Sequence, residues 1–352
     1  MKQDKPTHVT LLQVAKHAGV SRSTASLALR GGPYVSSATR EKVLESVRQL
    51  GYVYDRGAAS LRSKSSSTVG LIFPDLDNPF YTALLIGINQ ELNKYNKTVL
   101  LGTTFESCAT QDQLISTMLE YRVGGIILFA VPGSSKELIA RIKHLGIPVV
   151  LINRNLPERS FDYIGIDNIM AGQVATEYLI KKGHKRIAFL GGFSQLSSWQ
   201  ERKLGYENAL RQAGLDIDNA LIIEGPATRE SGYELMDKIL DLKNIPTAAF
   251  CFNDIIAIGA MIKLKERGFV PGQDMAIIGN DDIPEASIFT PKLTTVSSFP
   301  QLRGARAASL LYKRMEGLTT EPQSIIVQPE LIIRESCSCK ADILPSTNQQ
   351  SN

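Results

Sequence analysis

Polar side chains gather directly after apolar runs at several places in the chain. The runs are VGLIF, PVVLI, RIAFLGG, TAAFCF and MAIIG. The side chains that follow are carboxylates, amides, an arginine and aromatic rings: Asp75, Asp77, Asn78 and Phe80; Asn153 and Arg154; Phe193 to Trp199; Asn253 and Asp254; Asp281 and Asp282. Paired polar atoms can hold neighbouring hydroxyl groups, and an aromatic ring can cover an apolar ring face. These residues predict a binding site for a polyhydroxylated ligand.

Some of these residues have a second interpretation. Asp254 and Asp282 each follow a ligand candidate directly, and each could instead cap a helix or turn. If the core folds as two lobes, Arg154 could form an ion pair between them rather than contact the ligand. The sequence contains no dinucleotide-binding, Walker, nucleophile-elbow or zinc-protease motif. We therefore expect no enzyme, no cofactor and no metal site.

The elements that position these residues are predicted by hydrophobic patterning. From Val69 onward, short apolar runs alternate with amphipathic helical stretches, in two series along the chain. Continuous apolar strands alternating with helices are typical of parallel sheets covered on both faces. Two series predict two similar lobes. Ligands of such sheets bind beyond the carboxyl ends of the strands, which is where the polar residues lie.

A different pattern occupies Val9 to Leu29. Thr10 and Gln13 have the spacing of a capping box, Gly19 can end a first helix, and Ser21 can begin a second. Two short helices joined by a tight glycine turn form a helix-turn-helix, whose second helix can lie in a DNA major groove.

The second of these helices presents Arg22, Ser23 and Thr24 near its start. Such donors suit base edges and phosphates. Ser37 is expected to begin a third helix, in which Arg40 is a candidate phosphate contact. An ordinary helical hairpin in a small bundle is the alternative interpretation of the same pattern.

The charge distribution favours nucleic acid as a partner of the N-terminal part. Residues 1–65 hold 11 Lys and Arg against 4 Asp and Glu, whereas the remainder holds 28 against 31, so that a net charge of +4 conceals a basic module. No apolar run approaches the roughly 20 residues that span a bilayer, and the N-terminus lacks the apolar segment of a secretory signal. We therefore predict a cytoplasmic protein without membrane contact. The cysteines lack zinc-site spacing, and Cys337 and Cys339 are interpreted as a reduced pair in the tail.

The segments VTLLQVAKHAGVSRSTASLALRGG and VSSATREKVLESVRQLGY closely resemble the N-terminus of the LacI/GalR family of bacterial transcriptional regulators, of the lactose-repressor type. The resemblance runs on to about Ser336. It implies an all-α helix-turn-helix headpiece followed by an α/β core of two similar doubly wound lobes, like those of periplasmic sugar-binding proteins. It also implies a homodimer whose headpieces read a pseudo-palindromic double-stranded DNA operator.

The resemblance divides the chain as follows: headpiece 1–54, hinge 55–67, core 68–336, and a tail 337–352 that we expect to be disordered. Lobe 1 is expected over about 68–163 and 292–323, and lobe 2 over about 164–291 and 324–336. The chain would then cross between the lobes near Ile164, Pro291 and Ser324.

In the family the hinge becomes helical on operator DNA and a leucine wedges into the minor groove. Leu61 matches that leucine and Arg62 flanks it. Leu27 occupies a later groove-facing position of the recognition helix. The full set of expected DNA-binding residues is Thr10, Ser21, Arg22, Ser23, Thr24, Leu27, Arg40, Leu61 and Arg62.

The resemblance also assigns ligand residues. Arg202 in QERKLGY, Asn253 in CFND and Asp281 in GNDD match effector-binding residues of sugar-responsive relatives, and Asn153 stands where several relatives carry aspartate. Ala227 stands roughly where lactose-type proteins have a stacking tryptophan, so we expect Trp199 to replace it. The full set of expected effector-binding residues is Asp77, Asn78, Phe80, Asn153, Trp199, Arg202, Asn253, Asp254 and Asp281.

These observations predict a ligand-responsive transcriptional regulator, with repression as the expected direction and a sugar or sugar derivative as the expected effector. Two alternatives remain: a two-lobed solute-binding protein without DNA function, and a purine-responsive repressor.

Overall fold

The computed structural model describes residues 9–29, 32, 34–53, 66–134, 136–144, 146–156 and 160–337. They form two compact units that divide between Ser65 and Ser66. Leu61 and Arg62 lie outside the described residues, as do nearly all of the expected hinge and all but the first residue of the expected tail. Within the described part of the chain, every helix is too short or too polar to cross a bilayer.

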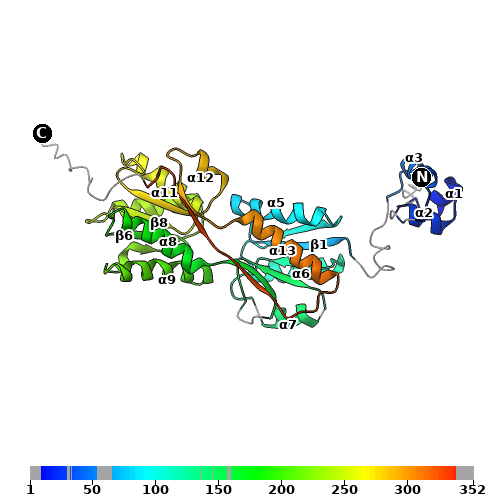
Figure 1. Ribbon diagram of the computed structural model, residues 1–352, viewed down its shortest axis with the longest axis horizontal. Coiled ribbons are helices and arrows are strands. Elements are labelled where there is room, and N and C mark those ends of the chain that lie inside the picture. The colour runs from blue at the N-terminus through cyan, green and yellow to red at the C-terminus, as the bar shows by residue number, and fades with distance from the viewer. Residues whose placement is uncertain are drawn as a thin grey trace, which may run out of the picture. The chain divides into compact units, whose positions relative to one another are not determined.

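The described residues of the first unit form three helices: α1 (Leu11–His17), α2 (Arg22–Leu29) and α3 (Ser37–Leu50) (Figure 1). The capping box forms, because the Thr10 N–H donates to Gln13 Oε1 at 2.7 Å and the Gln13 N–H donates to Thr10 Oγ1 at 3.4 Å. Gly19 adopts a φ of 67°, in the left-handed region that glycine tolerates. The small core of this unit consists of Val14, Ala15, Ala25, Ala28 and Val43.

The second unit contains two six-stranded sheets. The first sheet, lobe 1, has the strand order β11-β5-β4-β3-β1-β2, and all its pairings are parallel. Its strands are β1 (Thr68–Phe73), β2 (Thr98–Thr103), β3 (Ile126–Leu128), β4 (Val149–Ile152), β5 (Asp162–Ile166) and β11 (Ser324–Val327). Its helices are α5 (Pro79–Asn93), α6 (Cys108–Glu120), α7 (Lys136–His144) and α13 (Pro300–Met315).

The second sheet, lobe 2, has the order β12-β10-β9-β8-β6-β7. Its strands are β6 (Ile187–Leu190), β7 (Ile222–Ile223), β8 (Ala248–Cys251), β9 (Ala276–Asp281), β10 (Thr294–Ser297) and β12 (Glu330–Ile332), of which only β12 pairs antiparallel. Its helices are α8 (Asn168–Lys181), α9 (Ser197–Gln212), α10 (Arg229–Leu240), α11 (Asp254–Glu266) and α12 (Pro284–Ile288), with a 3₁₀ turn at Asn219–Leu221.

Alternation along the strands explains why both faces of the first sheet are covered. Leu71 and Phe73 of β1 belong to the core cluster that contains residues of α5 and α13, whereas Ile72 belongs to the cluster that contains residues of α6 and α7. Successive side chains of a strand point to opposite faces, so an unbroken apolar strand needs helices on both sides. The doubly wound fold is confirmed.

The chain crosses between the lobes a few residues later than expected. It leaves the first sheet after Ile166, enters α13 after Ser297, and leaves β11 after Val327, rather than near Ile164, Pro291 and Ser324. Strands β5 and β11 remain paired as far as Ile166 and Val327, and strands β9 and β10 remain paired as far as Asp281 and Ser297. An earlier crossing would leave these buried backbone groups without partners.

The C-terminal boundary of the core also differs. Cys337, expected in the tail, is 1% exposed, and its thiol donates to the Ile277 carbonyl at 3.1 Å. The neighbouring Ser336 exchanges hydrogen bonds with Ile277 through its hydroxyl and its carbonyl. These contacts with the start of β9 hold Cys337 in lobe 2.

Three helix pairs cross at unusually close range through glycines, a feature that we did not predict. A Cβ added at any of these glycines would lie 2.0–2.3 Å from a carbonyl oxygen of the facing helix, far inside van der Waals contact. The pairs are Gly87 and Gly304 in α5 and α13, Gly172 and Gly205 in α8 and α9, and Gly232 and Gly259 in α10 and α11. The two lobes thus use the same packing device.

Candidate functional site

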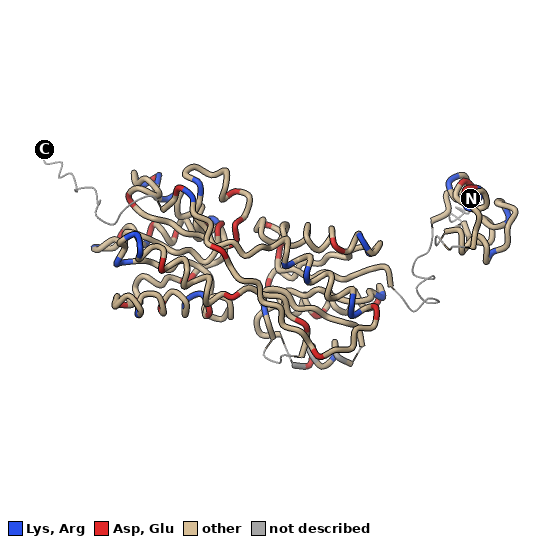
Figure 2. Tube along the Cα trace, in the orientation of Figure 1, with Lys and Arg blue, Asp and Glu red and all other residues tan. Residues whose placement is uncertain are grey.

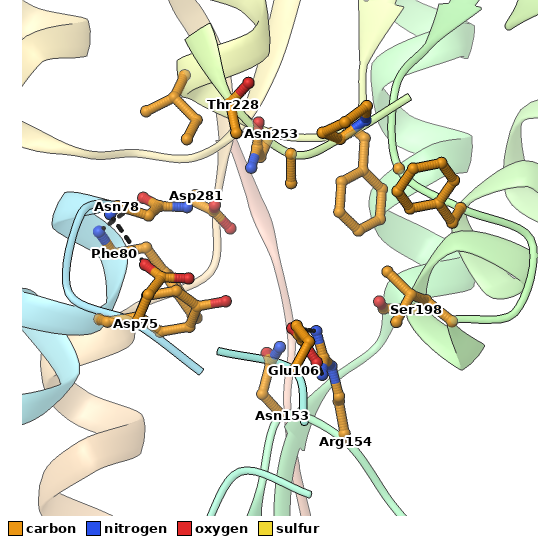
Figure 3. A pocket seen from close by; sticks show the side chains of 18 of the residues that line it. Asp75, Asn78, Phe80, Glu106, Asn153, Arg154, Ser198, Thr228, Asn253 and Asp281 are labelled. Carbon is orange, nitrogen blue, oxygen red and sulfur yellow. Dashed lines mark hydrogen bonds and ion pairs between the residues drawn. The ribbon is translucent and has the colours of Figure 1, made fainter. Parts of the chain in front are cut away.

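A cleft of about 870 Å³ lies between the two lobes, at the carboxyl ends of their strands. This volume is in the range of small-molecule sites, about 300–1,000 Å³. Figure 3 shows Thr228 and Asn253 of lobe 2 opposite Glu106, Asn153 and Arg154 of lobe 1. The expected ligand residues that line the cleft are Asp77, Asn78, Phe80, Asn153, Arg202, Asn253 and Asp281. Trp199 and Asp254 do not line it.

Trp199 is a core residue, so its expected role as a stacking platform is wrong. It is 6% exposed, its indole N–H donates to the Gly191 carbonyl at 3.0 Å, and its ring packs 5.7 Å from that of Phe189. The first turn of α9 directs this side chain onto strand β6 and away from the cleft. Phe193, which is 39% exposed and lines the same cleft as Ala227, is an aromatic residue available to a ligand.

Asp254 is likewise buried rather than ligand-facing. Its carboxylate accepts hydrogen bonds from the Ile283 N–H at 2.9 Å and from Thr295 Oγ1 at 2.5 Å, which ties α11 to the segments after β9 and in β10. Burial, reinforced by the nearby Asp281 carboxylate, raises the pKa of Asp254 to about 8. The cap of α11 is Asn253, whose Oδ1 accepts from the Ile256 N–H at 3.0 Å.

Asp282 pairs with Arg334 at 2.6 Å. It therefore serves as an ion-pair partner rather than as the cap considered above.

Substitution of Asp254 by asparagine is expected to change the pH dependence of stability. Because the folded pKa is raised from about 3.9 in an unfolded chain to about 8, the folded state holds a proton that the unfolded state releases. The stabilisation from this proton is complete below the unfolded pKa and disappears as the pH rises through 8.

The asparagine side chain would keep an acceptor for the Ile283 N–H and remain neutral, so Asp254→Asn should melt at a higher temperature than wild type at pH 8.5 and lose this advantage at pH 5. Calorimetric melting at the two pH values measures the difference. An equal shift at both would show that Asp254 is ionised in the folded chain.

Asp281 and Arg202 form the floor of the cleft on the lobe 2 side. Arg202 is 4% exposed and donates through Nε to Asn168 Oδ1 at 3.0 Å and through Nη1 to the Phe252 carbonyl at 2.5 Å. Asp281 is 5% exposed and accepts from the Asn280 amide at 2.9 Å through Oδ1. Among the residues that the structure describes, no donor reaches its Oδ2. Burial raises the pKa of Asp281 to about 6, although Arg202 opposes the shift, so the group is ionised at neutral pH.

Arg154 is held inside lobe 1. Both of its terminal nitrogens donate to the Glu106 carboxylate at 2.7 Å, which makes a bidentate pair. The pair therefore joins the ends of β2 and β4 and does not bridge the lobes, contrary to the alternative considered above. Glu106 follows the strand TVLLGT, and applying the strand-end rule to that strand as well would have identified it.

Three arginines stack on phenylalanines that line the cleft. The guanidinium carbon lies 4.7 Å from the ring centre in the first two pairs and 5.2 Å in the third: Arg154 with Phe129, Arg202 with Phe252, and Arg303 with Phe80. Cations over ring faces hold the rings in place, so the cleft has aromatic walls of defined orientation. Arg303 could not be found from strand ends because it lies on helix α13.

The first unit presents the exposed face of α2. Arg22, Ser23 and Leu27 are exposed, and the described part of this unit carries more basic than acidic residues (Figure 2). Other expected DNA contacts are engaged internally. Thr10 belongs to the capping box, and Ser21 Oγ accepts from the Thr24 N–H at 3.0 Å and pairs with its hydroxyl.

Arg40 contacts the segment at the end of α2. Its guanidinium donates to the Gly32 carbonyl at 2.8 Å and to the Ala28 carbonyl at 3.4 Å, and its contact with phosphate stays a prediction. Carbonyls at a helix C-terminus lack partners within the helix and attract a cation, which the sequence position alone did not reveal.

Each of the two units matches the model of a known protein family. Residues 10–55 match the model for bacterial regulatory proteins of the lacI family, and residues 66–335 match the model for periplasmic binding proteins and the sugar-binding domain of the LacI family. The chain belongs to the LacI family. It is therefore a DNA-binding transcriptional regulator and not an enzyme, and a solute-binding protein without DNA function is excluded.

Two LacI-family relatives and one solved structure illustrate the match. The HTH-type transcriptional regulator CelR of Thermobifida fusca is 33% identical over 334 residues, and the HTH-type transcriptional repressor PurR of Pasteurella multocida is 30% identical over 327 residues; each match covers 93% of this chain and 98% of the relative. The structure of a transcriptional regulator CelR–cellobiose complex superimposes with a TM-score of 0.71 at 32% identity, covering 94% of this chain and 100% of that one.

Proposed function

We propose that the chain is a repressor whose operator affinity is controlled by a sugar or sugar derivative bound in the cleft. The observation that carries this proposal is the set of polar atoms in the cleft that remain uncommitted. The Asp281 Oδ2 accepts no protein hydrogen bond among the described residues, and the Oδ1 atoms of Asn153 and Asn253 are engaged within the protein, which leaves their amide NH₂ groups to donate. A sugar hydroxyl both donates and accepts, so it matches a carboxylate on one side and amides on the other.

The aromatic walls support the same ligand class. Phe80, Phe129, Phe193 and Phe252 line the cleft, and an apolar sugar-ring face packs well on such surfaces. The structural relative bound to cellobiose is consistent with a sugar in this chain. Asp77 and Asn78 border the same space from the loop before α5 and are further candidate contacts.

For DNA, we propose that two headpieces of a homodimer read the half-sites of a pseudo-palindromic operator, in the cytoplasm, with α2 in the major groove. Arg22, Ser23 and Leu27 are the proposed base-facing residues because their side chains are exposed on α2. Leu61 is the proposed minor-groove wedge, with Arg62 beside it; both lie outside the described residues.

Substitution of Arg22 by alanine is expected to weaken operator binding by about 1–3 kcal/mol if its guanidinium donates to a guanine. The operator can be selected from random double-stranded DNA by the full chain, and affinities for it and for unselected DNA measured at one salt concentration. The matched control is Arg48→Ala, because Arg48 of α3 is exposed and pairs with Glu45 of the same helix. Equal losses of Arg22→Ala on both DNAs would make Arg22 a phosphate contact instead.

A thermal-shift panel of neutral sugars, sugar phosphates and purines tests the ligand. A bound ligand raises the melting temperature by mass action, and the same compound should then change the affinity for the selected operator. A shift caused only by purines would contradict the sugar assignment and favour a purine-responsive repressor, for which the PurR relative is the precedent. A ligand that binds without changing operator affinity would contradict the regulatory role of the cleft.

A further inference from the structure

The segment 279–283, which carries Asp281 into the cleft, has a strained backbone. Asp281 ends β9 with a φ of 129°, and Asp282 follows with a φ of 60°. A residue with a Cβ rarely adopts such a φ, because its side chain then crowds the neighbouring backbone. Asn280 donates to Asp281 Oδ1 at 2.9 Å, while its own buried Oδ1 has no hydrogen-bond partner among the described residues. Such a segment keeps its conformation only if the surrounding structure fixes it.

The side chain of Asp254 contacts both ends of the segment 279–283. At the C-terminal end, its Oδ2 accepts from the Ile283 N–H at 2.9 Å. At the N-terminal end, its Oδ1 lies against Gly279, where an added Cβ would be only 2.1 Å away. The Thr295 hydroxyl of β10 donates to the same Oδ1 at 2.5 Å. Asp254 is completely buried, so a single carboxyl group joins the two ends of the segment beneath the cleft surface.

Helix capping does not account for the Asp254 side chain. The cap of α11 is Asn253, whose Oδ1 accepts from the Ile256 N–H at 3.0 Å. Burying a carboxyl group is costly, and burial raises the pKa of Asp254 to about 8. An apolar side chain would fill the space without this cost, but it would leave the Ile283 N–H without a partner and the ends of the segment unconnected.

We propose that Asp254 is a positioning residue of the cleft: it holds the segment 279–283 in its strained conformation and so directs the open Asp281 oxygen at the ligand. A ligand hydroxyl then meets an acceptor whose direction is fixed before binding, which lowers the cost of ordering the site. The ligand-binding consequence rests on the proposed function, whereas the connection across the segment does not. The experiment therefore has a ligand-free arm and a sugar-binding arm.

Hydrogen–deuterium exchange of the ligand-free chain at pH 7.0 tests the connection. In Asp254→Leu, the amides of the segment 279–283 should exchange roughly tenfold faster or more, while β6 and α9 of the same lobe keep their protection. Asp254→Asn should stay near wild type, because its amide oxygen can accept from Ile283 and its NH₂ group can donate to the Thr295 hydroxyl. The control is Leu264→Ala, which opens a cavity near the other end of α11 and should leave the segment unchanged.

Calorimetric titration with cellobiose, which the CelR structure contains, measures the consequence for binding. Asp254→Leu should weaken binding roughly tenfold in the wild-type background, but less than about twofold in an Asp281→Ala background. A residue that acts through Asp281 has nothing to position once that carboxylate is removed. Leu264→Ala should bind as wild type does.

Four results would overturn the proposal: unchanged exchange of the segment 279–283 in Asp254→Leu, faster exchange spread evenly over lobe 2, Asp254→Asn behaving as Asp254→Leu does, or equal losses of affinity in the two backgrounds. If Asp254→Leu fails to fold, Thr295→Val replaces it, because it frees the carboxyl group to rotate while keeping the shape of the side chain. It should also loosen the segment, and unchanged exchange would again overturn the proposal.

The two arms separate this proposal from the proposed function. If wild type does not bind cellobiose, a sugar found by the thermal-shift panel takes its place. If no sugar binds, the proposed function is contradicted, and the exchange of the segment 279–283 decides by itself whether Asp254 holds the segment.

Discussion

Asp281→Ala is expected to weaken effector binding at least tenfold while the operator affinity of the ligand-free chain stays near wild type. The carboxylate lies on the cleft floor, 5% exposed, with one oxygen bonded to Asn280 and the other open to the cleft. A buried ligand hydroxyl that loses its partner costs about 1–3 kcal/mol, and hydrogen bonds to a charged group lie in the upper part of that range. Calorimetric titration with the sugar identified by the thermal-shift panel measures the loss.

Asp282→Ala is the matched control for this variant. Asp282 is the next residue, but its carboxylate pairs with Arg334 at 2.6 Å, and it does not line the cleft. Its removal should lower the melting temperature and leave effector affinity nearly intact. If Asp281→Ala binds the sugar as wild type does, the ligand lies elsewhere in the cleft.

The pH dependence of sugar binding follows from the same group. Burial raises the pKa of Asp281 to about 6, so the carboxylate is ionised at pH 7.5 and increasingly protonated below pH 6. A protonated carboxyl is a weaker acceptor than a carboxylate. Affinity for a hydroxyl-donating ligand should therefore fall as the pH drops from 7.5 to 5, and Asp281→Asn should remove most of this dependence. A wild-type affinity that is constant over this range would show that the ligand does not donate to Asp281.

Gly232→Ala is expected to destabilise the core by about 2–4 kcal/mol, the upper range for adding a methyl group to a packed interior. The new Cβ would lie 2.1 Å from the Ile256 carbonyl oxygen of the facing helix, and both partners are backbone, so α10 and α11 would have to separate. Helix α11 begins beside Asn253, so its displacement should also weaken effector binding.

Glu234→Ala provides the control on the same helix. Glu234 is exposed on α10 two residues away, and alanine is at least as good a helix former, so its free energy of unfolding should change by less than about 0.5 kcal/mol. Urea unfolding followed by circular dichroism compares the two variants. A Gly232→Ala protein as stable as Glu234→Ala would mean that the helices can move apart without loss.

Local signals in the sequence were sufficient to predict the helix ends of the headpiece. The capping box of Thr10 and Gln13, the left-handed Gly19 and the cap at Ser21 each act within three or four residues, and each appears in the structure as expected. These local signals do not decide whether Thr10 and Ser21 also contact DNA, which stays a prediction. A hydroxyl that caps a helix already accepts a hydrogen bond within the protein, whether or not it also contacts DNA.

The rule that polar residues at strand ends face a ligand located Asn153, Asn253 and Asp281, because the carboxyl ends of parallel strands share one edge of a sheet. It could not distinguish Asp281 from Asp254 or recognise Trp199 as a core residue. The direction in which each side chain points depends on how its helix or loop is rotated relative to neighbouring elements. That rotation is set only when the elements pack together.

Arg303 illustrates what the tertiary structure alone decided. It lies 150 residues after Asn153 in the chain, on a helix of the first lobe that follows five of the six strands of the second lobe. Nothing in its neighbourhood, SFPQLRGAR, distinguishes it from an exposed arginine of an amphipathic helix. Gly304 allows α13 to approach α5 closely, and the preceding arginine is completely buried and donates to Asn153 Oδ1. A contact between residues so far apart depends on the packing of both lobes, which no local pattern encodes.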